Sequence, residues 1–148
     1  MIGNFVENFI LKDQDGKDFD LYENLDKNIL LLFYPKDNSP VCTRQLSNYQ
    51  TNLAEFEKVN IRVVGINSND RESHQSFCKN IGLEITMLTD ENKTVSKKFN
   101  AVNFVGFIKR KLVLVSSSKK ILYEKTTLSL NFIDSNAFIS ELKSLKII

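Results

Sequence analysis

Two continuous apolar runs constrain the fold of this chain more than any other feature. The first, NILLLFYP, spans residues 28–35 and has turn-forming residues at both ends, and the second, IRVVGI, spans residues 61–66. Runs of this length without polar alternation are typical of strands that are buried on both faces of a sheet. Pro35 should end the first strand, because proline cannot donate a hydrogen bond to a neighbouring strand.

The segments around these runs alternate between helix and strand patterns. In FILKDQDGKDFDL, residues 9–21, the pair Asp15-Gly16 predicts a tight hairpin turn. Helices are predicted at 70–82, where Gly82 is the stop signal, and at 92–99. Two longer helical patterns have their apolar sides at Leu46, Tyr49, Leu53 and Phe56, and, within residues 135–148, at Ala137, Phe138, Leu142 and Leu145.

Three more strands complete the pattern, at 84–90, 111–116 and 119–125. The last two are separated by so few residues that they should form a hairpin, which makes the sheet mixed. Strands that alternate with helices indicate an α/β fold. We therefore predict one domain over residues 1–148, with a central mixed sheet flanked by helices and an N-terminal β-hairpin.

Composition and charge indicate the class of protein and the compartment that we expect. The 148 residues are 42% hydrophobic and 26% charged, which is typical of one globular domain. The 20 Lys and Arg residues are interspersed with 18 Asp and Glu residues, so we expect no nucleic-acid partner. The sequence begins without a signal-peptide pattern and has no apolar segment of membrane length, so we expect a cytoplasmic protein that does not associate with membranes. Cysteines stay reduced there, and a disulfide would be transient.

Cys42 follows a helix-start signal. Ser39 is a favoured N-cap residue and Pro40 fits the first helical position, which places Cys42 in the first turn. Free backbone N–H groups and the positive end of the helix dipole stabilise an anion there, and a thiolate is such an anion. These signals leave two interpretations open: a reactive cysteine, and a buried, inert one.

The inventory of side chains excludes several kinds of chemistry. One histidine, His74, and two cysteines cannot build a typical structural zinc site, and five scattered glycines make no phosphate-binding loop. A Cys-His protease or transferase would need His74 as its base. A thioredoxin-like disulfide carrier would need a cysteine three residues after Cys42, where Gln45 stands. The remaining option is a thiolate that itself attacks a small electrophile.

The interval Pro35-x-x-x-Ser39-x-x-Cys42 resembles the peroxidatic motif of peroxiredoxins, Pro-x-x-x-Thr/Ser-x-x-Cys. FYPKDNSPVCT is similar in particular to the bacterioferritin-comigratory, or Q-type, branch of the AhpC/TSA family. The later segments VVGINSNDRESHQSF and LTDENKTVSKKFNAV are spaced as in that branch, and the likeness runs from about Phe9 to Glu124. It implies a thioredoxin-like fold and a thiol peroxidase that needs no metal, haem or flavin.

The resemblance implies a role for each of four residues. Cys42 would attack a hydroperoxide and become a sulfenic acid. Ser39 would hydrogen-bond the peroxide or the sulfur, and Pro35 would shield the sulfur from water. Arg110, just before a predicted strand, would stabilise the thiolate and the charge on the leaving oxygen. The expected substrates are hydrogen peroxide and organic hydroperoxides. The expected reductant is thioredoxin or a similar dithiol, and the expected state is a monomer or weak dimer.

Two positions concern the recycling of the oxidised cysteine. Many members of the branch have a resolving cysteine five residues after the first, where this chain has Ser47. A subset resolves from the helix that corresponds to 70–82, which makes Cys78 the candidate for an intramolecular disulfide. Cys78 also extends an apolar stripe with Phe77 and Ile81, so it could be a core residue, with an external thiol as the resolver. A non-catalytic interaction or holdase domain on the same fold is the third interpretation.

Gln45 departs from the family pattern, which commonly has a glutamate three residues after the nucleophile. Glutamine can still hydrogen-bond, but it brings no negative charge near the thiolate.

Overall fold

A seven-stranded sheet runs through the computed structural model, which describes residues 1–148. Its strands are β1 (Ile10–Lys12), β2 (Asp18–Asp20), β3 (Asn28–Phe33), β4 (Ile61–Asn67), β5 (Thr86–Thr89), β6 (Arg110–Val115) and β7 (Ile121–Thr127). They are ordered β2-β1-β5-β4-β3-β6-β7. Strands β3, β4 and β5 are mutually parallel, whereas β6, β7 and the β1–β2 hairpin pair antiparallel. The predicted mixed sheet and N-terminal hairpin are therefore confirmed.

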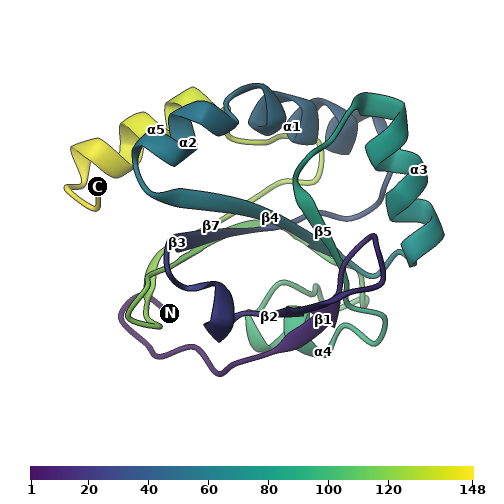
Figure 1. The fold of residues 1–148 in the computed structure, drawn as a ribbon, viewed down its shortest axis with the longest axis horizontal. Coiled ribbons are helices and arrows are strands. Elements are labelled where there is room, and N and C mark those ends of the chain that lie inside the picture. The colour runs from purple at the N-terminus through teal and green to yellow at the C-terminus, as the bar shows by residue number, and fades with distance from the viewer.

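Helices cover both faces of this sheet. They are α1 (Pro40–Thr51), α2 (Leu53–Lys58), α3 (Arg71–Ile81), α4 (Thr94–Lys98) and α5 (Ser135–Ser144), with a short 3-10 helix, η1, at Tyr22–Asn24. Figure 1 shows α1, α2 and α5 over one face, while α4 lies on the other side of the sheet. None of the helices is both long enough and apolar enough to cross a membrane.

The central strand β3 explains the apolar run that dominates the sequence. Its alternate side chains point into two separate hydrophobic clusters, and every residue from Ile29 to Tyr34 is fully buried. Leu30, Leu32 and Tyr34 pack with α1, α2, α3 and α5, whereas Ile29, Leu31 and Phe33 pack with α4 and the N-terminal segment. The prediction of a strand buried on both faces is confirmed, and Cys42 belongs to the first cluster.

The structure corrects one predicted helix, which is broken into α1 and α2 at Asn52. The Asn52 side chain donates to Ser135 Oγ at 2.6 Å and to the Asn48 carbonyl at 3.3 Å, which ties the break to the start of α5. Leu46, Tyr49 and Phe56 are nevertheless buried as predicted.

The C-terminal helix is also shorter than predicted, because α5 ends at Ser144 and Lys146 has a positive φ of 57°. Ala137 and Leu145 were expected on its apolar side but are exposed, and Ile139 is buried instead. The other predicted elements are present with ends shifted by one or two residues. Gly16 (φ 77°) and Gly82 (φ 66°, at the end of α3) take the left-handed conformation that their predicted turns require.

Candidate active site

Cys42 lies in the first turn of α1, as the helix-start signal predicts. Ser39 occupies the N-cap position with extended backbone, Pro40 follows as the first helical residue, and the Thr43 N–H donates to the Ser39 carbonyl at 2.8 Å. Ser39 is thus the N-cap residue as predicted, although its side chain makes no capping hydrogen bond. Its hydroxyl is therefore not committed to the helix end.

Arg110 contacts the sulfur directly. Its Nη2 donates to Cys42 Sγ at 3.3 Å, and both residues are buried, with 3% and 0% of their surface exposed. The contact joins residues 68 positions apart because β6 lies beside β3, with Lys111 opposite Phe33. Arg110, the first residue of β6, thus lies next to the end of β3, where the loop toward Cys42 begins.

The remaining contacts of Arg110 are all with neutral groups. Nη1 donates to Gln45 Oε1 at 2.6 Å, and Nη2 and Nε donate to the Ser129 carbonyl at 2.9 and 3.3 Å. Arg110 forms no ion pair with a carboxylate. Because an unpaired buried cation is costly, the sulfur of Cys42 is the neighbouring group that can supply a negative charge. Gln45 keeps a hydrogen-bonding role, and the contact with Ser129 was not predicted.

Pro35 lies in the loop between β3 and α1. It lies two residues beyond the last residue of β3 and is half-buried, followed by the exposed Lys36 and the buried Asp37. Pro35 and Ser39 therefore lie in the short loop that leads from β3 to α1, and Cys42 follows in the first turn of that helix. Arg110 contacts the Cys42 sulfur from the neighbouring strand β6.

Asp37 is the centre of a polar cluster that the sequence analysis missed. Its Oδ1 accepts hydrogen bonds from the Tyr34 hydroxyl and from Asn67 Nδ2, the latter at 3.1 Å. Its Oδ2 accepts from Ser73 Oγ at 2.7 Å and lies 2.7 Å from His74 Nδ1. Two sequence features could have indicated this cluster. Asp37 lies inside the Pro35–Cys42 motif, and Ser73-His74 lie in the segment VVGINSNDRESHQSF, which is spaced as in Q-type peroxiredoxins.

His74 is fully buried, and both of its ring nitrogens face other groups. Nδ1 pairs with Asp37, and Nε2 lies 3.1 Å from the Leu88 carbonyl. No nitrogen remains to act as a base for Cys42, so the geometry gives no support to a Cys-His protease or transferase. Burial would raise the pKa of Asp37, but contacts with His74, Tyr34 and Ser73 outweigh burial and lower it below its usual value.

Cys78 lies in the last turn of α3 and is half-buried against the cluster that contains Cys42. Both cysteines are free thiols. Burial, and then the negative charges of Asp37 and Asp15, raise the pKa of Cys78 to about 11. The apolar stripe predicted for this helix is real, since Phe77 is fully buried and Ile81 packs against the same cluster.

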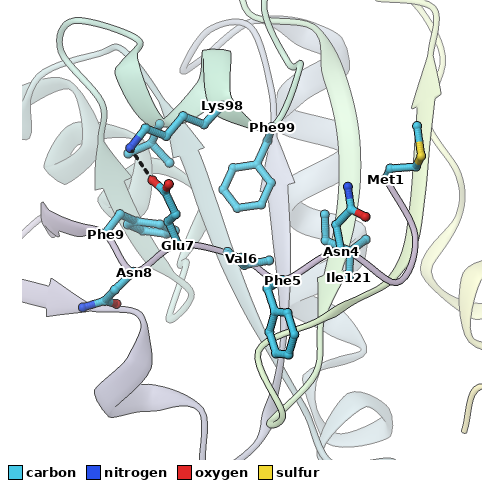
Figure 2. A pocket seen from close by; sticks show the side chains of 11 residues that line it. Met1, Asn4, Phe5, Val6, Glu7, Asn8, Phe9, Lys98, Phe99 and Ile121 are labelled. Carbon is cyan, nitrogen blue, oxygen red and sulfur yellow. Dashed lines mark hydrogen bonds and ion pairs between the residues drawn. The ribbon is translucent and has the colours of Figure 1, made fainter.

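A hollow of about 320 Å³ lies elsewhere, between the N-terminal segment and α4. Figure 2 shows Phe5, Phe9 and Phe99 around it, with Lys98 bonded to Glu7 at its edge. Several of its lining residues belong to the hydrophobic cluster on the face of the sheet away from Cys42. It is therefore separate from the candidate active site. Nowhere in the molecule do three or more His, Cys, Asp or Glu side chains gather as they would around a metal ion.

Comparison with known proteins decides the family, because residues 2–124 match the AhpC/TSA family. The chain belongs to the AhpC/TSA family. Within it, the chain is 38% identical over 100 residues to the peroxiredoxin bcp of Helicobacter pylori strain J99 and 38% identical over 97 residues to chloroplastic peroxiredoxin Q of Triticum aestivum. These matches cover 68% and 66% of this chain, and they span 66% of the first relative and 45% of the second. The resemblance to the Q-type branch of the family is confirmed.

Solved structures of the AhpC/TSA type confirm the fold. Peroxidoxin BcpB of Mycobacterium tuberculosis superimposes with a TM-score of 0.86, at 24% identity, over 99% of this chain and 97% of that one. The C47S mutant of Xylella fastidiosa PrxQ gives a TM-score of 0.86 at 23% identity, over 99% and 96% of the two chains. The predicted thioredoxin-like fold is therefore correct.

Proposed function

We propose that this protein is a thiol-dependent peroxidase that reduces hydrogen peroxide and organic hydroperoxides at Cys42. The observation that carries the proposal is the 3.3 Å contact between Arg110 Nη2 and Cys42 Sγ in a buried site where Arg110 has no carboxylate partner. A guanidinium in that position favours the thiolate, and the first turn of α1 places Cys42 at the positive end of the helix dipole.

In the proposed reaction, the Cys42 thiolate attacks one oxygen of the hydroperoxide. The S–O bond forms as the O–O bond breaks, so the sulfur is oxidised to a sulfenic acid and the other oxygen leaves as hydroxide or alkoxide, which takes up a proton. Arg110 stabilises the negative charge on that leaving oxygen. The uncommitted hydroxyl of Ser39 bonds the peroxide, and Pro35 limits the access of water.

We further propose that Cys78 resolves the sulfenic acid. The Cys78 sulfur attacks the Cys42 sulfur, water leaves, and a disulfide forms that thioredoxin or a similar dithiol reduces by thiol–disulfide exchange. Support comes from the packing of Cys78 against the cluster that holds Cys42. Cys42 lies in the first turn of α1 and Cys78 in the last turn of α3. Because helix ends unfold locally more easily than helix centres, unfolding of these two turns would let the sulfurs meet.

One observation favours a second candidate, a one-cysteine peroxidase resolved by an external thiol. The raised pKa of Cys78, about 11, leaves it mostly protonated at neutral pH and therefore a weak nucleophile in the folded state. Mass spectrometry after one equivalent of peroxide separates the two candidates. Loss of two hydrogens indicates the Cys42–Cys78 disulfide, and gain of one oxygen indicates a stable sulfenic acid.

The activity itself is tested by steady-state peroxide consumption with thioredoxin and its reductase. We expect turnover in the wild type and none in Cys42→Ser. Wild-type activity no greater than that of Cys42→Ser would refute the peroxidase. If Cys78→Ser turns over like wild type with thioredoxin as the only thiol, the assignment of Cys78 as resolver fails while the peroxidase stands.

We also infer that residues 1–148 act as one domain in the cytoplasm, as a monomer or weak dimer. The single sheet that extends from the N-terminal hairpin to β7 supports one domain. Exposed apolar side chains on the two loops that flank Arg110 support weak self-association; they are Phe104, Val105, Phe107, Leu128 and Leu130. Sedimentation at increasing protein concentration tests this association.

A further inference from the structure

The Asp37 carboxylate joins two segments that are far apart in the sequence. One is the loop that leads from β3 to Cys42, and the other is α3, which carries Cys78. Asp37 Oδ2 is 2.7 Å from both Ser73 Oγ and His74 Nδ1, across 36 and 37 residues of chain. A further bond links the same segments, because Asn80 Nδ2 donates to Asn38 Oδ1 at 3.2 Å. The Asp37 N–H also donates at 2.8 Å to Asn69 Oδ1, in the short loop that leads into α3.

The contact between Asp37 and His74 is fully buried. The Leu88 carbonyl can only accept, so His74 Nε2 carries a hydrogen. Nδ1 lies 2.7 Å from the Asp37 carboxylate, which also accepts hydrogen bonds from Tyr34 and Ser73. Both side chains are at most 1% exposed, so solvent screens the pair weakly.

This pair lies close to both cysteines. Tyr34, which donates to Asp37, is fully buried and packs its ring near Phe77, with ring centroids 6.2 Å apart. Tyr34 and Cys42 belong to the same hydrophobic cluster, and Cys78 packs against that cluster. Tyr34 therefore links the polar cluster at Asp37 to the hydrophobic cluster that both cysteines contact.

We propose that Asp37 is a positioning residue, and that its buried pair with His74 is a latch that holds the loop of residues 34–39 and helix α3 closed on each other. Opening the latch releases the loop and α3 together. On the proposed function, this joint opening is the conformational step that lets Cys78 reach oxidised Cys42. The closed latch keeps Cys42 beside Arg110, in the arrangement that reacts with peroxide.

The test is hydrogen–deuterium exchange of the reduced protein, followed by mass spectrometry of peptides that cover residues 34–46 and 71–83. In Asp37→Asn, we expect exchange to become faster in both peptides by about tenfold, since a charged contact is replaced by a neutral one. In His74→Gln, the loop peptide should exchange faster although the substitution lies in α3. The double variant should be little faster than either single one.

Asp15→Asn is the matched control. It removes the same charge from an exposed residue that also acts electrostatically on Cys78, and Asn-Gly suits the turn at Gly16. It should leave both peptides unchanged. If Asp37→Asn does not fold, Ser73→Ala removes one bond to Oδ2 and should give a smaller change of the same sign in both peptides. A change confined to the substituted segment, or no change in either, overturns the latch.

The effect of the latch on disulfide formation is measured separately. The protein is quenched at intervals after one equivalent of peroxide, and the sulfenic acid and disulfide forms are quantified by mass spectrometry. Conversion of sulfenic acid to disulfide should be about tenfold faster in Asp37→Asn than in wild type, because the charged contact between residue 37 and α3 is replaced by a neutral one. An unchanged or slower conversion overturns the role of the latch in resolution. If wild-type Cys42 is not oxidised at all, the proposed function fails, whereas the exchange experiment needs no peroxide and decides the latch independently.

Discussion

The two cysteines of this chain lie at opposite ends of helices and in opposite electrostatic surroundings. Cys42 is in the first turn of α1, fully buried, and accepts a hydrogen bond from Arg110. Cys78 is in the last turn of α3, half-buried, and under the influence of Asp37 and Asp15. The helix dipole is positive at the first position and negative at the second, so it acts in the same direction as the local charges in both cases. The comparison teaches that burial alone does not set the surroundings of a thiol here: burial and negative charges act together on the half-buried Cys78, whereas the more deeply buried Cys42 has a cation beside its sulfur.

Removing the cation should have the largest effect on this contrast. We expect Arg110→Gln to lower the second-order rate constant of Cys42 with hydrogen peroxide by about 10²–10³-fold, as for loss of a donor that stabilises transition-state charge. The measurement is competition kinetics at neutral pH. Arg44→Gln, an exposed arginine on the same helix, is the matched control and should retain the wild-type rate. A loss no greater in Arg110→Gln than in Arg44→Gln would contradict the assigned role.

The second prediction concerns the reactivity of Cys78 in the folded state. In Cys42→Ser, alkylation of Cys78 should rise with pH and level off only above a pKa of about 11, because burial, Asp37 and Asp15 disfavour the thiolate. At pH 7 the rate should be about a hundredfold lower than in the urea-unfolded chain, as a shift of this size implies. A midpoint that is the same in folded and unfolded protein would show that the two cysteines do not differ as described.

The orientation of Arg110 should contribute a smaller effect. Gln45 Oε1 accepts from Nη1 and so directs Nη2 toward Cys42. Gln45→Ala should lower the peroxide rate constant by about five- to tenfold, the value of a neutral hydrogen bond. Gln75→Ala, at an exposed position on α3, is the control and should have no effect. Equal rates in the two variants would mean that the Ser129 carbonyl alone orients the guanidinium.

The smallest expected effect is on stability in acid. The pKa of Asp37 is lower in the folded protein than in the unfolded chain, so the stability it contributes is present above the unfolded pKa of about 3.9 and is lost as the pH falls through the lower folded value. Urea unfolding at pH 6 and pH 3 should therefore show a smaller loss of stability in Asp37→Asn than in wild type. Equal losses would indicate that Asp37 is not ionised in the folded protein.

Much of this molecule follows from local sequence signals. The run over residues 28–35 predicts a strand buried on both faces, and Ser39-Pro40 predicts the helix start that places Cys42 in a first turn. The break at Asn52 was not predictable in this way, because it depends on a hydrogen bond to Ser135, 83 residues away. The resemblance to peroxiredoxins pointed to Arg110, whereas its neighbourhood in the sequence, Lys109-Arg110-Lys111, suggests only a basic surface turn.

Strand periodicity, helix caps and the motif around Cys42 are properties of neighbouring residues, so the sequence alone determined the α/β fold and the position of the first sulfur. The partners of that sulfur and of Asp37 were decided only by the tertiary structure. The β3–β6 register brings Arg110 to Cys42, and the packing of α3 brings His74 to Asp37. The physical reason is that a buried charge needs a counter-charge in space, and the distance along the chain does not restrict where that counter-charge comes from.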